Sequence, residues 1–170
     1  MPVSEPATML TDYALALLAA YFVLSLYLRS PDRKMSLWIA AFSVIAFAAL
    51  AGGTAHGFRI PLGESWGLVR RITLLSIALG SALLIAAGIR SAIHPETLDR
   101  NARSIGHRWL KRAVAISLLG LAVLVLKLSP DPRFNHNDLY HVIQMGGLYC
   151  LYRGAILLGG LSDSRTESVN

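Results

Sequence analysis

Long apolar runs separated by short polar segments organise the chain. Each run has about 20 residues, the length that a helix needs to cross the hydrocarbon core of a bilayer. None alternates between polar and apolar residues as a membrane barrel strand does. Because lipid offers no partners to backbone groups, helices are the favoured way to cross it. The pattern predicts an all-α, polytopic transmembrane bundle of about five helices, at residues 10–28, 36–58, 67–89, 109–128 and 137–161.

The polar segments are too short to separate domains. Residues 1–161 are therefore predicted to form one transmembrane domain, followed by a disordered polar tail at residues 162–170. The longest predicted loop, residues 91–108, is also the most basic. It is interpreted as a topology anchor, with contact to anionic lipid headgroups as the functional alternative.

Composition supports a membrane environment. Hydrophobic residues make up 54% of the 170 residues and charged residues only 15%, whereas soluble domains carry about 25% charged residues. The net charge is +6, but the cations lie in short segments between apolar runs, which argues against a nucleic-acid partner. A single cysteine, Cys150, excludes an intramolecular disulfide.

The distribution of cations predicts the orientation. With the N-terminus outside and the C-terminus in the cytoplasm, ten Lys and Arg residues fall on the inner side and five on the outer side. The positive-inside rule favours this arrangement. Residues 1–7 contain no Lys or Arg, so the first run is predicted to be a retained helix rather than a secretory signal. The localisation expected is a multi-pass protein of the plasma or inner membrane.

Polar side chains gather at the predicted outer ends of the helices. Asp12 lies there on the first helix, His56 on the second, and His136, Asp138 and His141 on the last. Ionisable groups at that depth cost free energy unless they are paired, so they are expected to face the bundle interior.

The last helix also carries a polar stripe. Asn137, His141 and Gln144 are four and three residues apart and share one face, with Asp138 one residue off it. On the second helix, glycines flank His56 at positions 52, 53 and 57. Two interpretations stay open: the glycines leave room for a ligand beside the imidazole, or they pack against another helix.

Residues 140–149, Tyr-His-Val-Ile-Gln-Met-Gly-Gly-Leu-Tyr, resemble the last-helix signature of the alkaline ceramidases. That family belongs to the CREST superfamily of membrane hydrolases, which also includes the progestin/adiponectin receptors and hemolysin-III-like proteins. The resemblance implies that His56 and His141 bind a metal. Asn137 stands where the family has a further His, Gly52 where it has a Ser, and the predicted helices number five rather than seven.

This resemblance gives the first functional hypothesis, a zinc-dependent hydrolase of a lipid amide or ester. A catalytic zinc takes three protein ligands and activates a water. His56 and His141 are the first two candidates, and Asn137, His136 or a carboxylate would supply the third. The candidate general bases or orienting carboxylates are Asp12 and Asp138. The candidate substrate-binding residues are Gln144, Tyr149 and, for a lipid phosphate, Arg70.

Two further hypotheses stay open. The polar residues could form a non-catalytic structural network or a lipid-binding cluster, or His56 and His141 could be the axial ligands of a heme. Membrane lipids are the expected partners in each case. Glycine-rich faces on the third and last helices predict close helix packing, within one chain or in a homo-oligomer.

Overall fold

The computed structural model describes residues 3–29, 35–93, 100–131 and 134–159, and these residues form helices joined by turns. The one β contact among them is an isolated bridge between Asp131 and Phe134. The predicted tail and the last residues of the final predicted helix lie outside the described residues. The helices are α1 (Pro6–Arg29), α2 (Ser36–Gly57), the short α3 (Arg59–Leu62), α4 (Ser65–Ile93), α5 (Arg100–Val125) and α6 (His136–Leu158).

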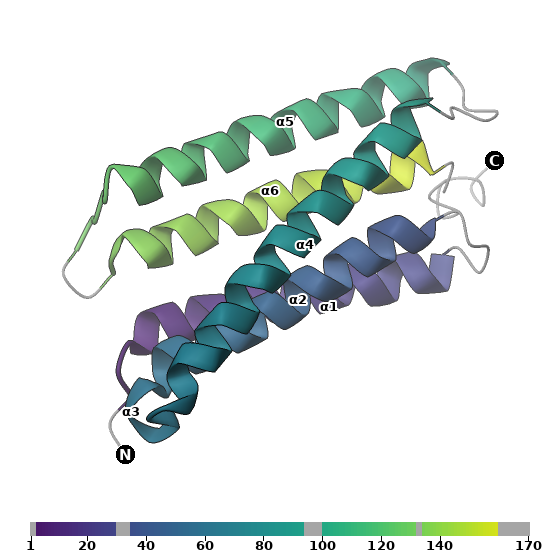
Figure 1. The fold of residues 1–170 in the computed structure, drawn as a ribbon. Helices are drawn as coiled ribbons and strands as arrows, with labels where there is room; N and C mark the ends of the chain where they lie inside the picture. Colours follow the sequence, from purple (N-terminus) through teal and green to yellow (C-terminus); the bar gives the residue numbers. More distant parts are fainter. Residues whose placement is uncertain (1–2, 30–34, 94–99, 132–133, 160–170) are drawn as a thin grey trace, which may run out of the picture.

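The five long helices alternate in direction (Figure 1). At one end of the bundle lie the starts of α1, α4 and α6 and the ends of α2 and α5. We call this the α3 end, because the short α3 also lies there. Packing divides the helices into two units, α1–α2–α4 and α5–α6. The units meet mainly where α1 lies against α6, and α4 adds a small contact.

Two helices extend into the segment that hydropathy predicts to be a loop. α4 continues to Ile93, and α5 begins at Arg100, so most of the predicted basic loop at residues 91–108 is helical. The loop prediction was wrong there because a hydropathy reading stops at charged residues. Arginine is nevertheless a good helix former, and a helix can extend past the hydrocarbon into water.

Local signals explain two of the helix ends. α5 ends at a left-handed Lys127, φ 50°, with hydrogen bonds from Lys127 N to Leu124 O and from Leu128 N to Val123 O. This is the Schellman arrangement, in which a residue just past the helix satisfies its last carbonyls. α6 begins with a capping box, in which Asn135 and Asp138 bond each other's backbone N–H groups.

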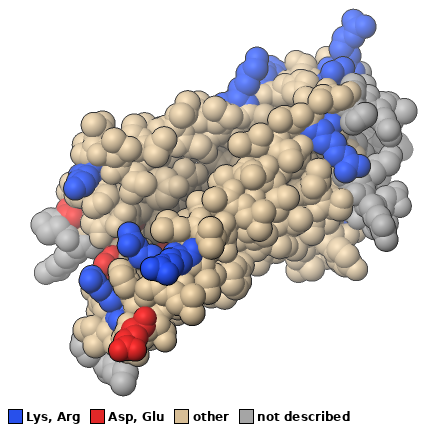
Figure 2. Space-filling model, viewed as in Figure 1, with Lys and Arg blue, Asp and Glu red and all other residues tan. Residues whose placement is uncertain are grey.

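Three helices, α1, α2 and α4, are long and apolar enough to cross a membrane. α5 does not meet that criterion, because its first half carries Arg and Lys residues and only residues 113–126 are free of charge. The most exposed of the three is α4: Gly80 and Ala87 are its buried residues. Over α4 the molecular face carries no charged side chain between its two ends (Figure 2), as a lipid-facing surface requires.

Glycines set the close approaches between neighbouring helices. A Cβ atom added at Gly80 of α4 would lie 2.6 Å from Ile45 of α2. A Cβ atom at Gly106 of α5 would lie 2.8 Å from Leu158 of α6, and one at Gly154 of α6 would lie 2.7 Å from Leu110 of α5. Small residues are the expected packing surfaces of helices in lipid, so the predicted packing role is confirmed within one chain for Gly80 and Gly154, and Gly106 adds a contact that was not predicted.

Candidate functional site

A buried polar cluster joins α1 to α6 at the α3 end of the bundle. Asp12 of α1 is 5% exposed and Asp138 of α6 is fully buried. His141 lies one turn beyond Asp138, and its Nε2 atom is 3.3 Å from Asp12 Oδ1. Asp12 lies six residues inside α1, about 9 Å from the start of the helix. The predicted gathering of these three side chains is therefore what the structure shows, and we call them, with Thr8 and Thr11, the polar cluster.

Both ring nitrogens of His141 have partners within the protein. While Nε2 faces Asp12, Nδ1 lies 3.1 Å from Thr11 Oγ1. The Thr11 hydroxyl also lies 3.0 Å from Thr8 O and 3.1 Å from Ala7 O. If this hydroxyl donates to a backbone carbonyl, it can only accept from Nδ1–H. Nδ1–H then donates to Thr11, and Nε2 faces the Asp12 carboxyl group at 3.3 Å.

Asp138 combines a capping role with an unpartnered atom. Its Oδ2 accepts a 2.7 Å hydrogen bond from the backbone N–H of Asn135. Its Oδ1 is buried and has no hydrogen-bond partner among the described residues. The Asn135 side chain in turn donates to Thr8 Oγ1 at 3.4 Å. Hydrogen bonds thus hold the N-terminus of α6 through its own cap and through Thr8 of α1. The Asp138 Oδ1 atom has no such bond among the described residues.

The two glycines that precede His56 bring α2 against this cluster. A Cβ atom at Gly52 would lie 3.1 Å from Asp12 Oδ2, and one at Gly53 would lie 2.7 Å from the Tyr13 ring. The space beside the glycines is therefore filled by α1. Of the two interpretations of this segment, helix packing is confirmed, and the room left for an external ligand was wrong at Gly52 and Gly53.

His56 lies near the cluster but has a different partner. Its Nδ1 is 2.9 Å from Glu5 Oε2, and both side chains are more than a third exposed. His56 and His141 are nevertheless close enough to interact electrostatically. The two imidazoles predicted to meet thus come from α2 and α6 to the same end of the bundle, and the His56 side chain is 36% exposed against 12% for His141.

The remaining metal candidates do not complete a coordination sphere in this conformation. Asn137 and His136 lie in the first turn of α6, where the backbone N–H of Asn137 bonds the cap side chain Asn135. No interaction between the side chain of Asn137 or His136 and the polar cluster is present among the described residues. In the part of the chain that the structure describes, no three His, Cys, Asp or Glu side chains converge as metal ligands.

The three candidate substrate-binding residues lie apart from the cluster. Gln144 faces α5, where its Oε1 accepts from Ser117 at 3.4 Å. Tyr149 packs edge-on against Trp109 of α5. The Arg70 guanidinium lies over the Trp66 ring of its own helix, 5.6 Å from the ring centre. These residues belong to three separate environments, so they do not share one pocket with Asp12 and His141.

Sequence reasoning missed the residues that satisfy the cluster. Thr8, Thr11, Asn135 and Glu5 have no role in the hypotheses above, yet each bonds one of its members or the neighbouring His56. A signal was present. Thr8, Thr11 and Asp12 are three and four residues apart, so they form a polar stripe on one face of an otherwise apolar helix.

Fold and site together define an all-helical protein with three membrane-length apolar helices and a buried polar cluster where α1 meets α6. A family model described as a family of unknown function, DUF6962, matches residues 7–105 and residues 97–159. The chain therefore belongs to that family. The two matches overlap at residues 97–105, close to where packing divides the helices into two units. No curated protein and no solved structure matches the chain. The resemblance to the alkaline ceramidases stays a prediction.

Proposed function

We propose that the chain is a five-span integral membrane protein whose polar cluster is a non-catalytic clasp that holds the α5–α6 unit against the α1–α2–α4 unit. The single observation that carries this proposal is the double engagement of His141 by Asp12 and Thr11, across the interface between the units.

The five-span topology places the N-terminus outside. α5 and α6 have 26 and 23 residues, about 39 Å and 34 Å of helix, against about 30 Å of hydrocarbon. α6 packs against α1, and α5 packs against α6 and runs along the bundle (Figure 1). In α5, Lys111 and Arg112 would extend towards the inner surface, as long cationic side chains do. The α3 end of the bundle is then the outer end.

In a membrane, the two helical units need polar contacts to hold them together in one arrangement, because their solvent is lipid. Apolar side chains gain little by leaving lipid for another helix, so polar contacts carry much of the specificity between membrane helices. The seam between α1 and α6 is the main contact between the two units. Asp12 is buried and His141 is largely buried, so each is costly without its partner. Their pairing therefore selects the one register in which α6 satisfies α1.

A double-mutant cycle tests the clasp. In detergent-purified protein, Asp12→Asn and His141→Gln should each lower the free energy of unfolding by about 3 kcal/mol, because each leaves a buried partner unsatisfied. The double variant should cost less than the sum, with a coupling of about 1–3 kcal/mol.

The matched control pairs Asp12→Asn with Tyr152→Phe. Tyr152 lies eleven residues after His141 on α6, about 16 Å along the helix, and removal of its hydroxyl affects the Ser25 bond instead. These two effects should add to within about 0.5 kcal/mol. Strict additivity in the Asp12–His141 cycle would contradict the clasp.

A zinc-dependent hydrolase is the second candidate. Two observations favour it: His56 and His141 reach the same end of the bundle, and the buried Asp138 Oδ1 has no partner. Here His56 and His141 would hold the zinc, Asp12 would orient the His141 imidazole, and Asp138 would serve as general base. The zinc would supply water activation for hydrolysis of a lipid amide or ester at the outer leaflet.

Metal analysis of the purified protein separates the two candidates. A hydrolase should contain about one zinc per chain, lost in the His56→Gln/His141→Gln double variant and retained in a His107→Gln control. A clasp should contain no stoichiometric metal, and added zinc should leave its melting temperature unchanged. The absorption spectrum of the same sample tests the heme hypothesis, because a bound heme would give a Soret band.

A further inference from the structure

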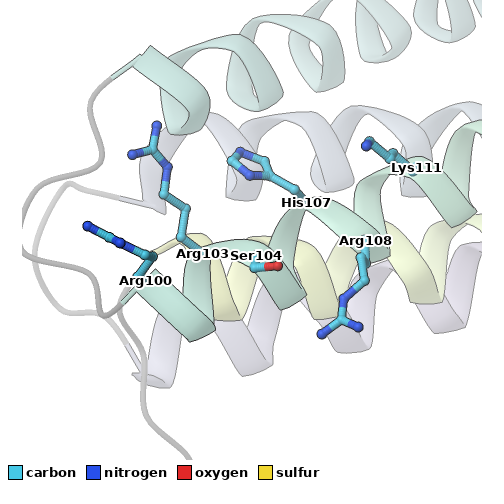
Figure 3. A pocket seen from close by; sticks show the side chains of 6 residues that line it. All are labelled: Arg100, Arg103, Ser104, His107, Arg108 and Lys111. Atoms are coloured by element: carbon cyan, nitrogen blue, oxygen red, sulfur yellow. The ribbon is translucent and has the colours of Figure 1, made fainter.

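A cationic hollow lies at the opposite end of the bundle, on the first three turns of α5 (Figure 3). Its volume is about 370 Å³, and its lining residues are Arg100, Arg103, Ser104, His107, Arg108 and Lys111. These positions form two neighbouring rows of residues four apart, 100/104/108 and 103/107/111, on one face of the helix. Figure 3 shows Arg103 and His107 extended along one flank and Arg108 along the other. We call these residues the cationic stripe.

The lining of the stripe contains four permanent cations and no carboxylate. Arg100 and Arg103 are three residues apart, as are Arg108 and Lys111, so like charges are neighbours on the helix surface and repel each other. Among the described residues, the stripe makes one hydrogen bond to another helix, from Arg103 to the carbonyl oxygen of Ala92 at the end of α4, at 3.4 Å. An anion in the hollow would relieve the repulsion and accept hydrogen bonds from the guanidinium groups.

Trp109 indicates the depth of the stripe in a bilayer. The Arg112 guanidinium lies 5.0 Å from the centre of its ring and the Arg153 guanidinium 5.6 Å. Tryptophans that lie among cations are typical of the membrane–water interface. The uncharged half of α5 starts at Ala113. The stripe therefore lies at and just outside the headgroup level, where a phosphate of a lipid can reach it.

We infer that the cationic stripe binds the headgroup of an anionic phospholipid of the inner leaflet. The guanidinium groups of Arg103 and Arg108 hold the phosphate oxygens from the two rows, and the Ser104 hydroxyl lies between them on the hollow floor. The acyl chains then run along the uncharged half of α5. This site depends on α5 lying at a membrane surface and is independent of the polar cluster at the other end.

Native mass spectrometry of the detergent-solubilised protein, titrated with short-chain phosphatidylglycerol, tests the inference. Each Lys or Arg near a charged lipid is worth about a fivefold change in affinity, so Arg108→Gln/Lys111→Gln should weaken binding about 25-fold. Arg108→Lys/Lys111→Arg keeps the total charge and one guanidinium group, so its affinity should stay within about threefold of that of the unmodified chain.

The matched control is Arg59→Gln/Arg71→Gln, which removes two exposed cations from the α3 end and should leave the affinity unchanged. Equal affinity for phosphatidylcholine and phosphatidylglycerol would overturn the inference. Competition by inorganic phosphate at the concentration of the lipid would also overturn it, because the ligand would then be a soluble phosphate. A loss in the control variant as large as in the stripe variant would show that only net charge matters.

Discussion

The two ends of the α1–α6 seam are held in different ways. At the α3 end, the polar cluster joins the helices through the 3.3 Å contact between His141 and Asp12 and the hydrogen bond between His141 and Thr11. Further along the seam, Phe22 of α1 stacks on Tyr152 of α6 with ring centres 4.3 Å apart, and its edge meets Phe42 of α2. There the one polar contact is the 2.6 Å bond between Ser25 and Tyr152. We call this second region the aromatic end.

The two regions contribute differently to the packing of α1 against α6. The aromatic end contributes most of the strength of the contact, and the polar cluster fixes the register of the two helices. The aromatic end gains from many weak contacts, which a small sliding of one helix weakens only gradually. In the polar cluster, each displaced partner leaves a buried polar atom without a hydrogen bond, and this is costly in a medium without water. We therefore expect substitutions at the aromatic end to lower stability most, and substitutions in the cluster to show the strongest dependence on their partners.

The largest single effect should come from Phe22→Ala at the aromatic end. Phe22 is 1% exposed, and truncation of a buried phenylalanine costs about 3–5 kcal/mol because it leaves a cavity. Denaturation of the purified protein measures this. Leu17→Ala on the same helix, at a position 74% exposed, is the control and should change stability by less than about 0.5 kcal/mol. Equal effects would mean that α1 does not bury the Phe22 face.

Two substitutions of Asp138 distinguish the contribution of its cap hydrogen bond to stability from the contribution of its negative charge. Asp138→Ala removes the acceptor for the Asn135 N–H and should cost about 1–2 kcal/mol. Asp138→Asn keeps an acceptor oxygen and should cost less than half of that. Thermal unfolding of both variants measures the difference. If Asn were as destabilising as Ala, the negative charge rather than the cap would be the stabilising feature.

Glu5→Gln should have the smallest effect. The Glu5–His56 pair is more than a third exposed, and exposed ion pairs contribute about 0–1 kcal/mol and weaken with salt. Unfolding at low and high salt checks this, with Asp12→Asn as the comparison. A loss as large as that of Asp12→Asn would show that His56 belongs to the same buried network as His141.

Hydropathy predicted the helical class well because the length of an apolar run is a local property. In the structure, three of the five predicted helices are long and apolar enough to cross a membrane. Hydropathy nevertheless placed the start of α5 too late. There the cationic stripe was interpreted as a loop, although the backbone of a helix can continue past the lipid while its side chains become charged.

Part of the polar cluster was also within reach of sequence reasoning. Asp12, Asp138 and His141 could be placed at one depth, because rise per residue fixes the height of a side chain on its helix. Which groups touch could not be derived. The pairing of His141 with Thr11, and of His56 with Glu5, depends on how α1 rotates against α2 and α6.

By itself, the sequence determined the helices and the end of the bundle at which each ionisable group lies, because both follow from local periodicity and from the cost of charge in lipid. Only the tertiary structure decided that α1 fills the space beside Gly52 and Gly53 and that Asp12 pairs with His141. Those contacts join residues up to 129 positions apart, and their geometry depends on the packing of whole helices.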